Sequence, residues 1–480
     1  MSTTSSTSTT TAAPSQEALR ALLATQRSYA SGVRAQNASE RIAKLKRMTA
    51  YLSDQKNVDG LIAALQADFR KPEVETLLSE LGTVLSHLRY VSSRLKRWME
   101  PTKLSVPLSL IGMRNYVYKE PKGCALIIAP WNYPFNLTLI PLIYAISAGC
   151  TAVVKPSEFS PATTAFIKGM IEELFDEREI KVVTGEGDTS AFLTTLPFDH
   201  IFFTGSPAIG KKVMAAAAKN LTSVTLELGG KSPAIIDQGI NLKKSAENTV
   251  WGKCFNAGQT CIAPDYLLID KSIALEYVGE LSAALTRFYG EDAQQSASFA
   301  RIINLRHFDR VKALLDDAIS KGAIIAHGGR TDRDDLFIEP TILTGVTEAM
   351  DVMQEEIFGP LWPVVTYGTL GEAVEIINRR DKALAFYIQS DNRTTIKKLL
   401  AGTSSGGALI NEYLLGASSA SVPFGGVNNS GIGKSFGYHG FVEFTNERAV
   451  MERRFLDLSM SYPPYTDKVV SLVRRIYGWL

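Results

Sequence analysis

One of the four cysteines stands where a thiol can act as a nucleophile. Cys261 lies in the loop-forming string NAGQTCIAP, after a helical stretch and before the apolar run YLLID. A cysteine thiolate is a strong nucleophile, and a loop beside a helix end gives it access to a substrate. Cys124 and Cys150 lie in or beside apolar runs, and Cys254 lies on the helical stretch. We interpret these three as buried core residues.

Polar strings follow four short apolar runs in order along the chain. They are Trp131-Asn132-Tyr133-Pro134, Lys155-Pro156-Ser157-Glu158, Thr204-Gly205-Ser206-Pro207 and Glu227-Leu228-Gly229-Gly230. Ligands of open α/β sheets bind outside the carboxyl ends of the strands. We therefore expect an amide, a lysine with a carboxylate, a Gly-Ser turn and a second carboxylate to meet at one edge of a sheet.

The Gly-Ser-Pro turn has the features of a phosphate site at a helix N-terminus. Gly205 permits close approach of the backbone, Ser206 can cap a helix, and Pro207 suits the first helical turn. The N–H groups there favour a phosphate, although an ordinary capped helix is the alternative. The chain has no G-x-G-x-x-G string. GGKS at 229–232 is not a P-loop because Thr225 stands where glycine is needed.

A G-x-S-x-G string at 402–406 does not predict a serine hydrolase. A nucleophile elbow needs a strand before the serine and a helix after it. Here the helical TTIKKLLA precedes the string and the strand-like GALIN follows it. The order of further triad candidates is also wrong, because His439 comes before Asp457.

The elements that carry these residues follow an α/β pattern. Helical spacing extends from about residue 17 to 100, and RNYVYKEPKG then alternates like an exposed strand. Apolar runs separated by amphipathic helices predict a parallel, doubly wound sheet, and a second such series follows Gly230. The expected strands are ALIIAP, TAVVKPS, IKVVTG, HIFFTGS, SVTLELGG, PAIID, YLLID, GAIIAHGG, IEPTILTGV, LAFYIQS and GALIN. Residues 440–456 are expected to form a strand-like arm.

Composition and charge exclude several classes of function. The 480 residues include 51 basic and 49 acidic side chains, a net charge of +2, which argues against nucleic-acid binding. The cysteines and five histidines lack metal-ligand spacing, so we expect no metal site. No apolar run reaches the roughly 20 residues of a membrane span. Residues 1–16 lack the features of a secretory signal and are expected to be a disordered tail on a cytoplasmic protein.

The whole set of motifs resembles the aldehyde dehydrogenase superfamily, from about residue 20 to 455. The matching motifs are PWNYP (130–134), VVKPSE (153–158), FFTGSPAIG (202–210), LELGGKSP (226–233), GQTC (258–261), EEIFGP (355–360) and PFGGVNNSG (423–431). GQTCIAPDY and the late YPP are most similar to the class 3, fatty-aldehyde-type branch. Asn428 departs from that branch, which more often has glycine there, and this puts the local loop geometry in question.

The resemblance implies an architecture of two α/β domains and a small bridging β-sheet that joins two subunits of a homodimer. The implied parts are a Rossmann-like cofactor domain over 17–228 with arm strands near 114–122, a catalytic domain over 229–411, a return segment and oligomerisation arm over 412–456, and a tail over 457–480. The family's Rossmann unit binds its cofactor without the usual glycine fingerprint, in agreement with the absence of that string here.

The resemblance also implies the chemistry. Cys261 would attack an aldehyde to form a thiohemiacetal and then a thioester, Asn132 would stabilise the oxyanion, and Glu227 would be the base for hydrolysis. The implied cofactor residues are Lys155 and Glu158 at the adenosine ribose, Gly205, Ser206 and Gly210 at the pyrophosphate, Glu356 at the nicotinamide ribose and Phe358 near the ring. NAD is the expected cofactor, with some NADP use, and the expected substrate is a medium- or long-chain aliphatic or an aromatic aldehyde.

Two alternatives and one unassigned segment remain. A non-catalytic protein of the same fold is disfavoured by the joint presence of Cys261, Glu227 and Asn132. A CoA-acylating dehydrogenase is disfavoured by Glu227, because such an enzyme needs no base for water. The C-terminal string 468–480, KVVSLVRRIYGWL, predicts a basic amphipathic helix too short to cross a bilayer. It would dock on its own dimer or make weak peripheral contact with a membrane surface.

Overall fold

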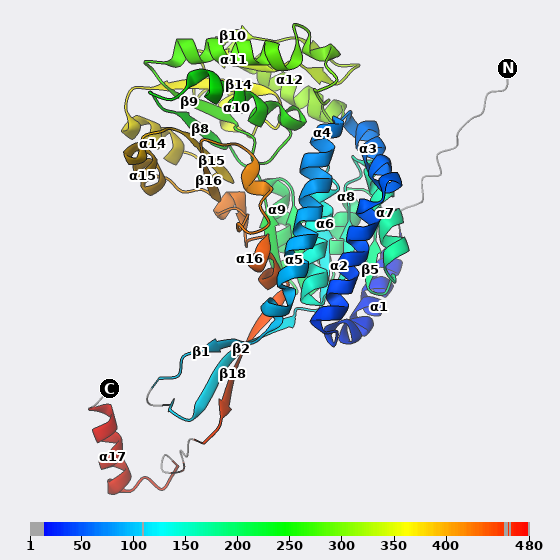
Figure 1. The fold of residues 1–480 in the computed structure, drawn as a ribbon, viewed down its shortest axis with the longest axis vertical. Coiled ribbons are helices and arrows are strands. Elements are labelled where there is room, and N and C mark those ends of the chain that lie inside the picture. Colours follow the sequence, from blue (N-terminus) through cyan, green and yellow to red (C-terminus); the bar gives the residue numbers. More distant parts are fainter. Residues whose placement is uncertain (1–13, 108–109, 456–458, 460–461, 479–480) are drawn as a thin grey trace, which may run out of the picture.

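The structure is a computed structural model that describes residues 14–107, 110–455, 459 and 462–478. Two units with large, mostly parallel sheets lie one above the other in Figure 1, and a long antiparallel arm projects away from both of them. The N-terminal helices lie beside the sheet of one unit, and helix α17 lies at the far end of the arm (Figure 1). This is the predicted α/β architecture of a Rossmann-like unit, a second α/β unit and a small third sheet.

The first sheet has six strands in the order β17-β7-β6-β3-β4-β5, and only β17 is antiparallel to its neighbour. Its strands are β3 (Cys124–Ile128), β4 (Thr151–Lys155), β5 (Ile180–Val182), β6 (His200–Thr204), β7 (Ser223–Glu227) and β17 (Gly431–Ile432). Successive residues of β3 point to opposite faces, so Ile127 packs in one apolar core and Leu126 in the other. Both faces are buried, which explains why these strands read as continuous apolar runs.

Helices cover both faces of this sheet. One face packs against α2 (Ala38–Ser53), α3 (Gln55–Phe69), α5 (Thr83–Met99), α6 (Asn136–Ala148) and α7 (Pro161–Leu174). The other packs against α1 (Gln16–Arg34), α8 (Gly187–Thr195) and α9 (Pro207–Ala218). Between α3 and α5 the chain forms the short helix α4 (Glu73–Glu75) and a π-helical segment, η1 (Thr76–Gly82). Such π-helical insertions are rare and often lie at functional sites.

The second sheet has seven strands in the order β10-β13-β14-β9-β8-β15-β16, and only β10 is antiparallel to its neighbour. Its strands are β8 (Pro233–Ile236), β9 (Tyr266–Asp270), β10 (Ile324–His327), β13 (Thr341–Thr344), β14 (Leu361–Tyr367), β15 (Ala385–Gln389) and β16 (Gly407–Ile410). One face packs against α10 (Leu242–Cys254) and α11 (Ala274–Tyr289). The other packs against α12 (Leu305–Ser320), α14 (Leu370–Asn378) and α15 (Arg393–Gly402).

The remaining elements connect and extend these units. The arm is an antiparallel sheet of β1 (Thr102–Leu104), β2 (Met113–Pro121) and β18 (Thr445–Arg453). Short elements are η3 (Phe255–Gly258), η4 (Ala293–Gln295), β11 (Thr331–Asp332), β12 (Phe337–Ile338), α13 (Asp351–Gln354), η5 (Leu415–Ala417) and η6 (Asn428–Ser430). Helix α16 (Gly437–Glu443) precedes β18, and α17 (Asp467–Tyr477) follows the arm.

Each of the eleven named runs contains a strand, which confirms that part of the prediction. One central strand, β14, was not predicted. It contains Pro363, and proline is uncommon in central strands because it cannot donate a ladder hydrogen bond. The domain boundaries that the resemblance implies stay predictions.

Two segment predictions need correction. The expected arm strand over 440–456 begins only at Thr445, because α16 occupies the residues before it. Gly440 lets this helix press against the ring of Tyr144, since a Cβ there would lie 2.9 Å from the ring. Helix α1 begins at Gln16, inside the expected tail, after an N-cap bond from Ala18 N–H to Ser15 Oγ. The rest of that tail, residues 1–13, lies outside the described residues, as do positions 479 and 480 of the expected final helix.

Two further observations concern membrane-spanning helices and metal sites. None of the helices in the described part of the chain combines the length and apolar character that crossing a membrane requires. Within the described ranges, no group of three or more histidine, cysteine, aspartate or glutamate side chains is arranged to hold a metal ion.

Candidate active site

A cavity of about 810 Å³ brings most of the predicted site residues together. Its lining includes Asn132, Gly205, Ser206, Glu227, Cys261, Glu356 and Phe358. The first sheet contributes the ends of β6 and β7, and the second unit contributes the 353–358 segment and residues 379–382. The cavity therefore lies where the two units face each other, at the carboxyl ends of the strands, as expected for an open α/β sheet.

Cys261 lies in a loop whose backbone is held in an unusual conformation. The loop follows α10 and η3, and Asn256 and Ala257 both adopt left-handed conformations, with φ of 57° and 52°. Gly258 continues the turn with φ of 76°, and a Cβ there would lie 2.4 Å from the carbonyl oxygen of Gly359. The turn therefore requires glycine at that position, and it brings Cys261 to the cavity.

A second cavity, of about 400 Å³, is also lined by Cys261. Cys261 and Leu137 line both cavities. The second cavity is lined mainly by apolar side chains, among them Leu77, Leu78, Tyr133, Trp251, Phe255, Ile262, Leu414, Leu415 and Phe424. None of the described residues that line it has a charged side chain. The thiol therefore lines both a large cleft that contains many charged side chains and a smaller, mainly apolar pocket.

Asn132 follows β3 and is held against the cysteine loop by two hydrogen bonds. Its Nδ2 donates to the carbonyl oxygen of Gln259 at 3.0 Å, and its own carbonyl oxygen accepts from Asn256 Nδ2 at 2.9 Å. An asparagine amide has two N–H donors. One N–H of Asn132 Nδ2 is used in the bond to Gln259, so the other N–H can point at a ligand in the cleft that Asn132 lines.

Glu227 is the last residue of β7, and its carboxylate is nine-tenths or more buried. Ser435 Oγ donates to Oε1 at 2.8 Å, whereas Oε2 has no hydrogen-bond partner among the residues that the structure describes. Burial raises the pKa of Glu227 to about 8, although the Ser435 hydrogen bond and the Lys434 charge act in the opposite direction. A carboxylate with such a pKa can take up a proton near neutral pH.

Burial also changes the pKa of the Cys261 thiol. It raises the pKa of Cys261 to about 12, and the negative charges of Glu356 and Glu227 act in the same direction. The backbone N–H groups of Cys261 and Ile262 act in the opposite direction, because they stabilise a thiolate. Ionisation of Cys261 is therefore opposed by the two carboxylates and favoured by a cation in the cleft.

The segment around Glu356 is fixed by contacts from both units. Arg310 Nη1 donates to the carbonyl oxygen of Glu356 at 3.1 Å. A Cβ on Gly229 would lie 2.3 Å from Glu356 Oε2, so glycine lets the carboxylate approach that backbone. Burial raises the pKa of Glu356 to about 8, and the negative charge of Asp265 acts in the same direction. Phe358 packs edge-on against Trp131, with ring centroids 5.4 Å apart.

The turn between β6 and α9 has the features that a diphosphate needs. Pro207 is the first residue of α9, and Ser206 occupies the N-cap position. Ser206 makes no capping hydrogen bond, which corrects the expectation that its side chain would cap the helix. Gly205 and Ser206 line the cleft with the first turn of α9, where backbone N–H groups favour an anion. The size of the cleft and these donors fit a dinucleotide.

Three predicted cofactor residues do not line the cleft. Lys155, at the end of β4, forms a 3.1 Å ion pair with Glu158, and neither side chain is part of the cavity lining. Burial lowers the pKa of Lys155, and the charge of Glu158 opposes that shift. Gly210 lies in the first turns of α9, where a Cβ would lie 2.7 Å from Leu228 Cδ2, so its role in the structure is close packing.

Several residues of the site were missed in the sequence. Ser435 and Lys434 lie a few residues past the PFGGVNNSG motif, and this closeness to the motif is the signal in the sequence that points to them. His307 and Arg310 come from α12 and had no signal of their own. Asn256 lies in the quoted NAGQTC string, and asparagine before a glycine-containing turn is a signal for left-handed backbone.

Comparison with known proteins defines the class. A model of the aldehyde dehydrogenase family matches residues 2–450. The 4,4'-diaponeurosporen-aldehyde dehydrogenase of Staphylococcus aureus is 42% identical over 431 residues, 89% of this chain and 92% of that protein. Aldehyde dehydrogenase family 3 member B1 of Rattus norvegicus is 42% identical over 440 residues, 91% of this chain and 92% of that protein.

Two further relatives are also aldehyde dehydrogenases. The dimeric NADP-preferring aldehyde dehydrogenase of Rattus norvegicus is 41% identical over 432 residues, 89% of this chain and 94% of that protein. A solved structure, the substrate-bound state of Staphylococcus aureus AldH, has a TM-score of 0.90 and 38% identity, covering 95% of this chain and 99% of that one. The chain belongs to the aldehyde dehydrogenase family and is similar to its class 3 members. It is an enzyme that oxidises aldehydes to carboxylic acids with a nicotinamide cofactor.

Proposed function

We propose that this enzyme oxidises aldehydes with an apolar body, medium- or long-chain aliphatic or aromatic, through covalent intermediates on Cys261. The observation that supports the proposal is that Cys261 lines both the large cleft with its charged side chains and the apolar pocket. A substrate in the apolar pocket presents its aldehyde carbon to the thiol. A nicotinamide cofactor would be held by residues of the larger cleft, which Cys261 also lines.

The first steps build a carbon that can lose a hydride. The Cys261 thiolate attacks the aldehyde carbon, forming a C–S bond and an oxyanion. The free N–H of Asn132 and the backbone N–H of Cys261 stabilise that oxyanion, and one such donor is typically worth about 3 kcal/mol in the transition state. A bound nicotinamide cofactor would supply the hydride acceptor and a positive charge that favours the thiolate. Loss of the hydride leaves a thioester on Cys261.

The last step releases the acid. Glu227 Oε2 takes a proton from a water molecule, and the resulting hydroxide attacks the thioester carbon. The C–S bond breaks, the carboxylic acid leaves and Cys261 is regenerated. The free oxygen of Glu227 and its pKa of about 8 suit a general base that becomes active as the pH approaches 8.

The cofactor is proposed to be NAD, with some use of NADP. Gly205, Ser206 and Gly210 would hold the pyrophosphate at the first turn of α9. Glu356 would bind the nicotinamide ribose, and Phe358 would pack near the ring. Lys155 and Glu158 would contact the adenosine ribose beyond the edge of the described cleft.

We also propose a homodimer assembled through the arm. The arm exposes apolar side chains, among them Leu104 and Met451, and β18 is an edge strand of its sheet. A relative that is 41% identical to this chain is described as dimeric. Pairing of arms would cover these apolar residues and the open strand edge.

A series of aldehydes of increasing chain length tests the proposed substrate class. Each methylene that enters an apolar pocket contributes about 0.8 kcal/mol, or roughly fourfold in kcat/KM. We therefore expect kcat/KM for NADH formation to rise with chain length until the pocket is filled. Leu78→Glu introduces a charge at the apolar pocket, so it should lower kcat/KM for long aldehydes more than for short ones. Leu275→Glu, on the exposed face of α11, is the matched control. A preference for short or charged aldehydes would contradict the proposal.

A further inference from the structure

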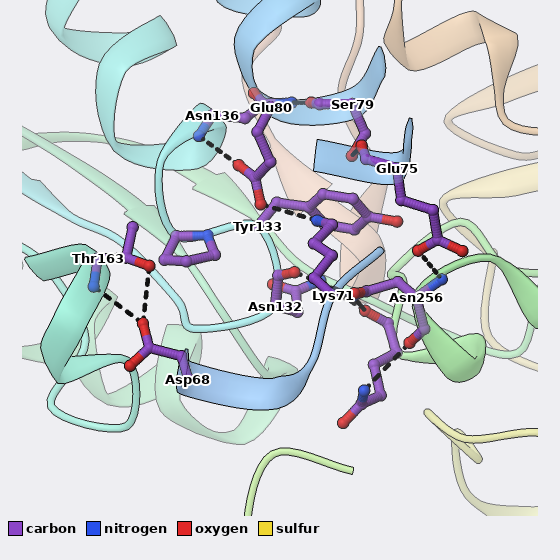
Figure 2. A network of polar contacts seen from close by, with 12 residues as sticks. Asp68, Lys71, Glu75, Ser79, Glu80, Asn132, Tyr133, Asn136, Thr163 and Asn256 are labelled. Atoms are coloured by element: carbon purple, nitrogen blue, oxygen red, sulfur yellow. Dashed lines mark hydrogen bonds and ion pairs between the residues drawn. The ribbon is translucent and has the colours of Figure 1, made fainter. Parts of the chain in front are cut away.

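A buried cluster of charged residues lies behind the loop that carries Cys261, and none of the roles above uses it. Lys71, Glu75 and Glu80 come from the short segment between α3 and α5, and all three are buried. Figure 2 shows this cluster at close range with the residues that it contacts, among them Asn132, Tyr133, Asn136 and Asn256. Buried charges are weak evidence of a stabilising role, because desolvation offsets the attraction between them.

The ion pair of the cluster anchors the segment to the first unit. Lys71 Nζ lies 2.8 Å from Glu80 Oε1 and 3.9 Å from the centroid of the Tyr133 ring. The other oxygen of Glu80 accepts a 2.8 Å hydrogen bond from the backbone N–H of Asn136, at the start of α6. Glu80 lies in the π-helical segment η1, so the non-standard turn forms part of this anchor.

Glu75 carries the contact to the cysteine loop. Its Oε2 accepts a 2.8 Å hydrogen bond from the backbone N–H of Asn256, 181 residues further along the chain. Asn256 and Ala257 are consecutive left-handed residues, a conformation that persists only when surrounding contacts enforce it. A charged acceptor on a backbone N–H makes a strong hydrogen bond of this kind.

Asn256 in turn contacts Asn132, the predicted oxyanion donor. Its Nδ2 donates to the carbonyl oxygens of Asn132 and Gln259, at 2.9 and 3.1 Å. Asn132 Nδ2 donates to the same Gln259 oxygen. A second link joins the two loops nearby, where Tyr133 Oη and Thr260 Oγ1 are 2.6 Å apart. Both loops that flank the thiol are thus tied to the cluster.

We propose that Glu75 is a positioning residue that holds the Asn256–Cys261 turn in register with Asn132, while the Lys71–Glu80 ion pair and the Glu80–Asn136 hydrogen bond anchor the segment that carries Glu75. The inference rests on the proposed roles of Cys261 and Asn132 in aldehyde oxidation. Glu75 touches neither substrate nor cofactor in this scheme. It fixes the distance between the attacking sulfur and the N–H that receives the oxyanion.

The main experiment compares Glu75→Ala with a control of matched chemistry. Glu179→Ala breaks another buried ion pair, Lys44–Glu179. Glu179 lies just before β5, which is the edge strand on the side of the sheet away from the cleft. Both variants should lower Tm. Glu75→Ala alone should slow single-turnover hydride transfer about 100-fold, the effect of a misplacement of roughly 1 Å, with an unchanged NAD dissociation constant.

Two more variants separate positioning from general stability. Glu75→Gln keeps an oxygen that accepts the Asn256 N–H, so it should recover most of the hydride-transfer rate. Asn256→Gly keeps the backbone N–H and tolerates the left-handed conformation, but it removes the Nδ2 bonds to Asn132 and Gln259. It should slow hydride transfer as Glu75→Ala does, and it tests the proposal even if Glu75→Ala does not fold.

A readout without aldehyde separates this proposal from the proposed function. Cys124, Cys150 and Cys254 are buried, so iodoacetamide should label Cys261 selectively. Loosening the turn weakens the backbone N–H contacts that stabilise the thiolate, and we expect slower alkylation in Glu75→Ala and Asn256→Gly but not in Glu179→Ala. Wild-type rates in folded Glu75→Ala and Asn256→Gly, or equal losses in Glu179→Ala, would overturn the proposal. A wild-type enzyme that oxidises no aldehyde would instead overturn the proposed function.

Discussion

Ser435 donates a 2.8 Å hydrogen bond to Oε1 of Glu227, which lies 208 residues earlier in the chain. The second oxygen of Glu227 is buried and has no hydrogen-bond partner within the described part of the chain, and Glu227 lines the cleft beside Cys261. One contact therefore fixes the carboxylate while leaving an oxygen free for a water molecule. The same contact holds the pKa of Glu227 lower than burial alone would set it.

The pH dependence of turnover follows from this pair. A general base acts when ionised, so a kcat limited by deacylation should rise as the pH rises through about 8, the raised pKa of Glu227. Ser435→Ala removes a hydrogen bond that favours the ionised form, and the rise should move to higher pH. Profiles of kcat against pH for the two proteins test this. A shift to lower pH, or no shift, would show that Ser435 does not set this pKa.

Glu227→Gln should separate hydride transfer from deacylation. The amide cannot take a proton from water, but it leaves Asn132 and Cys261 in place. We expect a rapid burst of one equivalent of NADH per site, followed by slow turnover. Stopped-flow fluorescence of NADH measures both phases. Loss of the burst itself, with slow hydride transfer, would assign Glu227 to an earlier step such as activation of the thiol.

Replacing single cysteines tests the nucleophile. Cys261→Ala should abolish aldehyde oxidation and leave NAD binding nearly intact, because the side chain is only one part of the cleft lining. Cys254→Ala is the matched control, since this thiol is fully buried at the end of α10, where burial raises its pKa. It should keep substantial activity at some loss of stability. The reverse pattern would make the assignment of Cys261 wrong.

Glu158→Gln should change cofactor preference. If Glu158 accepts hydrogen bonds from the adenosine ribose, its charge repels a 2′-phosphate, while its partner Lys155 attracts one. Removing the charge should raise kcat/KM for NADP relative to NAD. Glu172→Gln, in a surface ion pair with Lys168 on α7, should leave the ratio unchanged. An unchanged ratio in Glu158→Gln would show that this carboxylate does not face the ribose.

Deletion of residues 468–480 tests the C-terminal helix. Val470, Leu472 and Val473 are exposed on α17, and Figure 1 shows the helix apart from both sheet units. Docking on the dimer near the substrate entrance predicts a changed KM for long aldehydes after deletion. A membrane role predicts salt-sensitive co-sedimentation of the intact enzyme with anionic vesicles, which deletion abolishes. If deletion changes neither measurement, neither functional interpretation is right.

Local sequence patterns by themselves determined the strands and the polar residues at their ends. Apolar runs such as ALIIAP and HIFFT predict buried strands because both faces of β3 and β6 pack against helices. The carboxyl ends of parallel strands meet at one edge, so Asn132, Gly205 and Glu227 converge on one cleft. The loop setting of Cys261 was also visible, since the NAGQTC string favours a turn between α10 and β9.

Only the tertiary structure decided which distant residues touch these groups. Glu75 and Ser435 are separated by 181 and 208 residues from Asn256 and Glu227, and no local pattern encodes such contacts. Packing also overrode local preference where α16 replaced the expected strand. The same global packing left Lys155 and Glu158 outside the described cleft. Sequence spacing fixes side chains within one element, but the free energy of the whole fold fixes how elements meet.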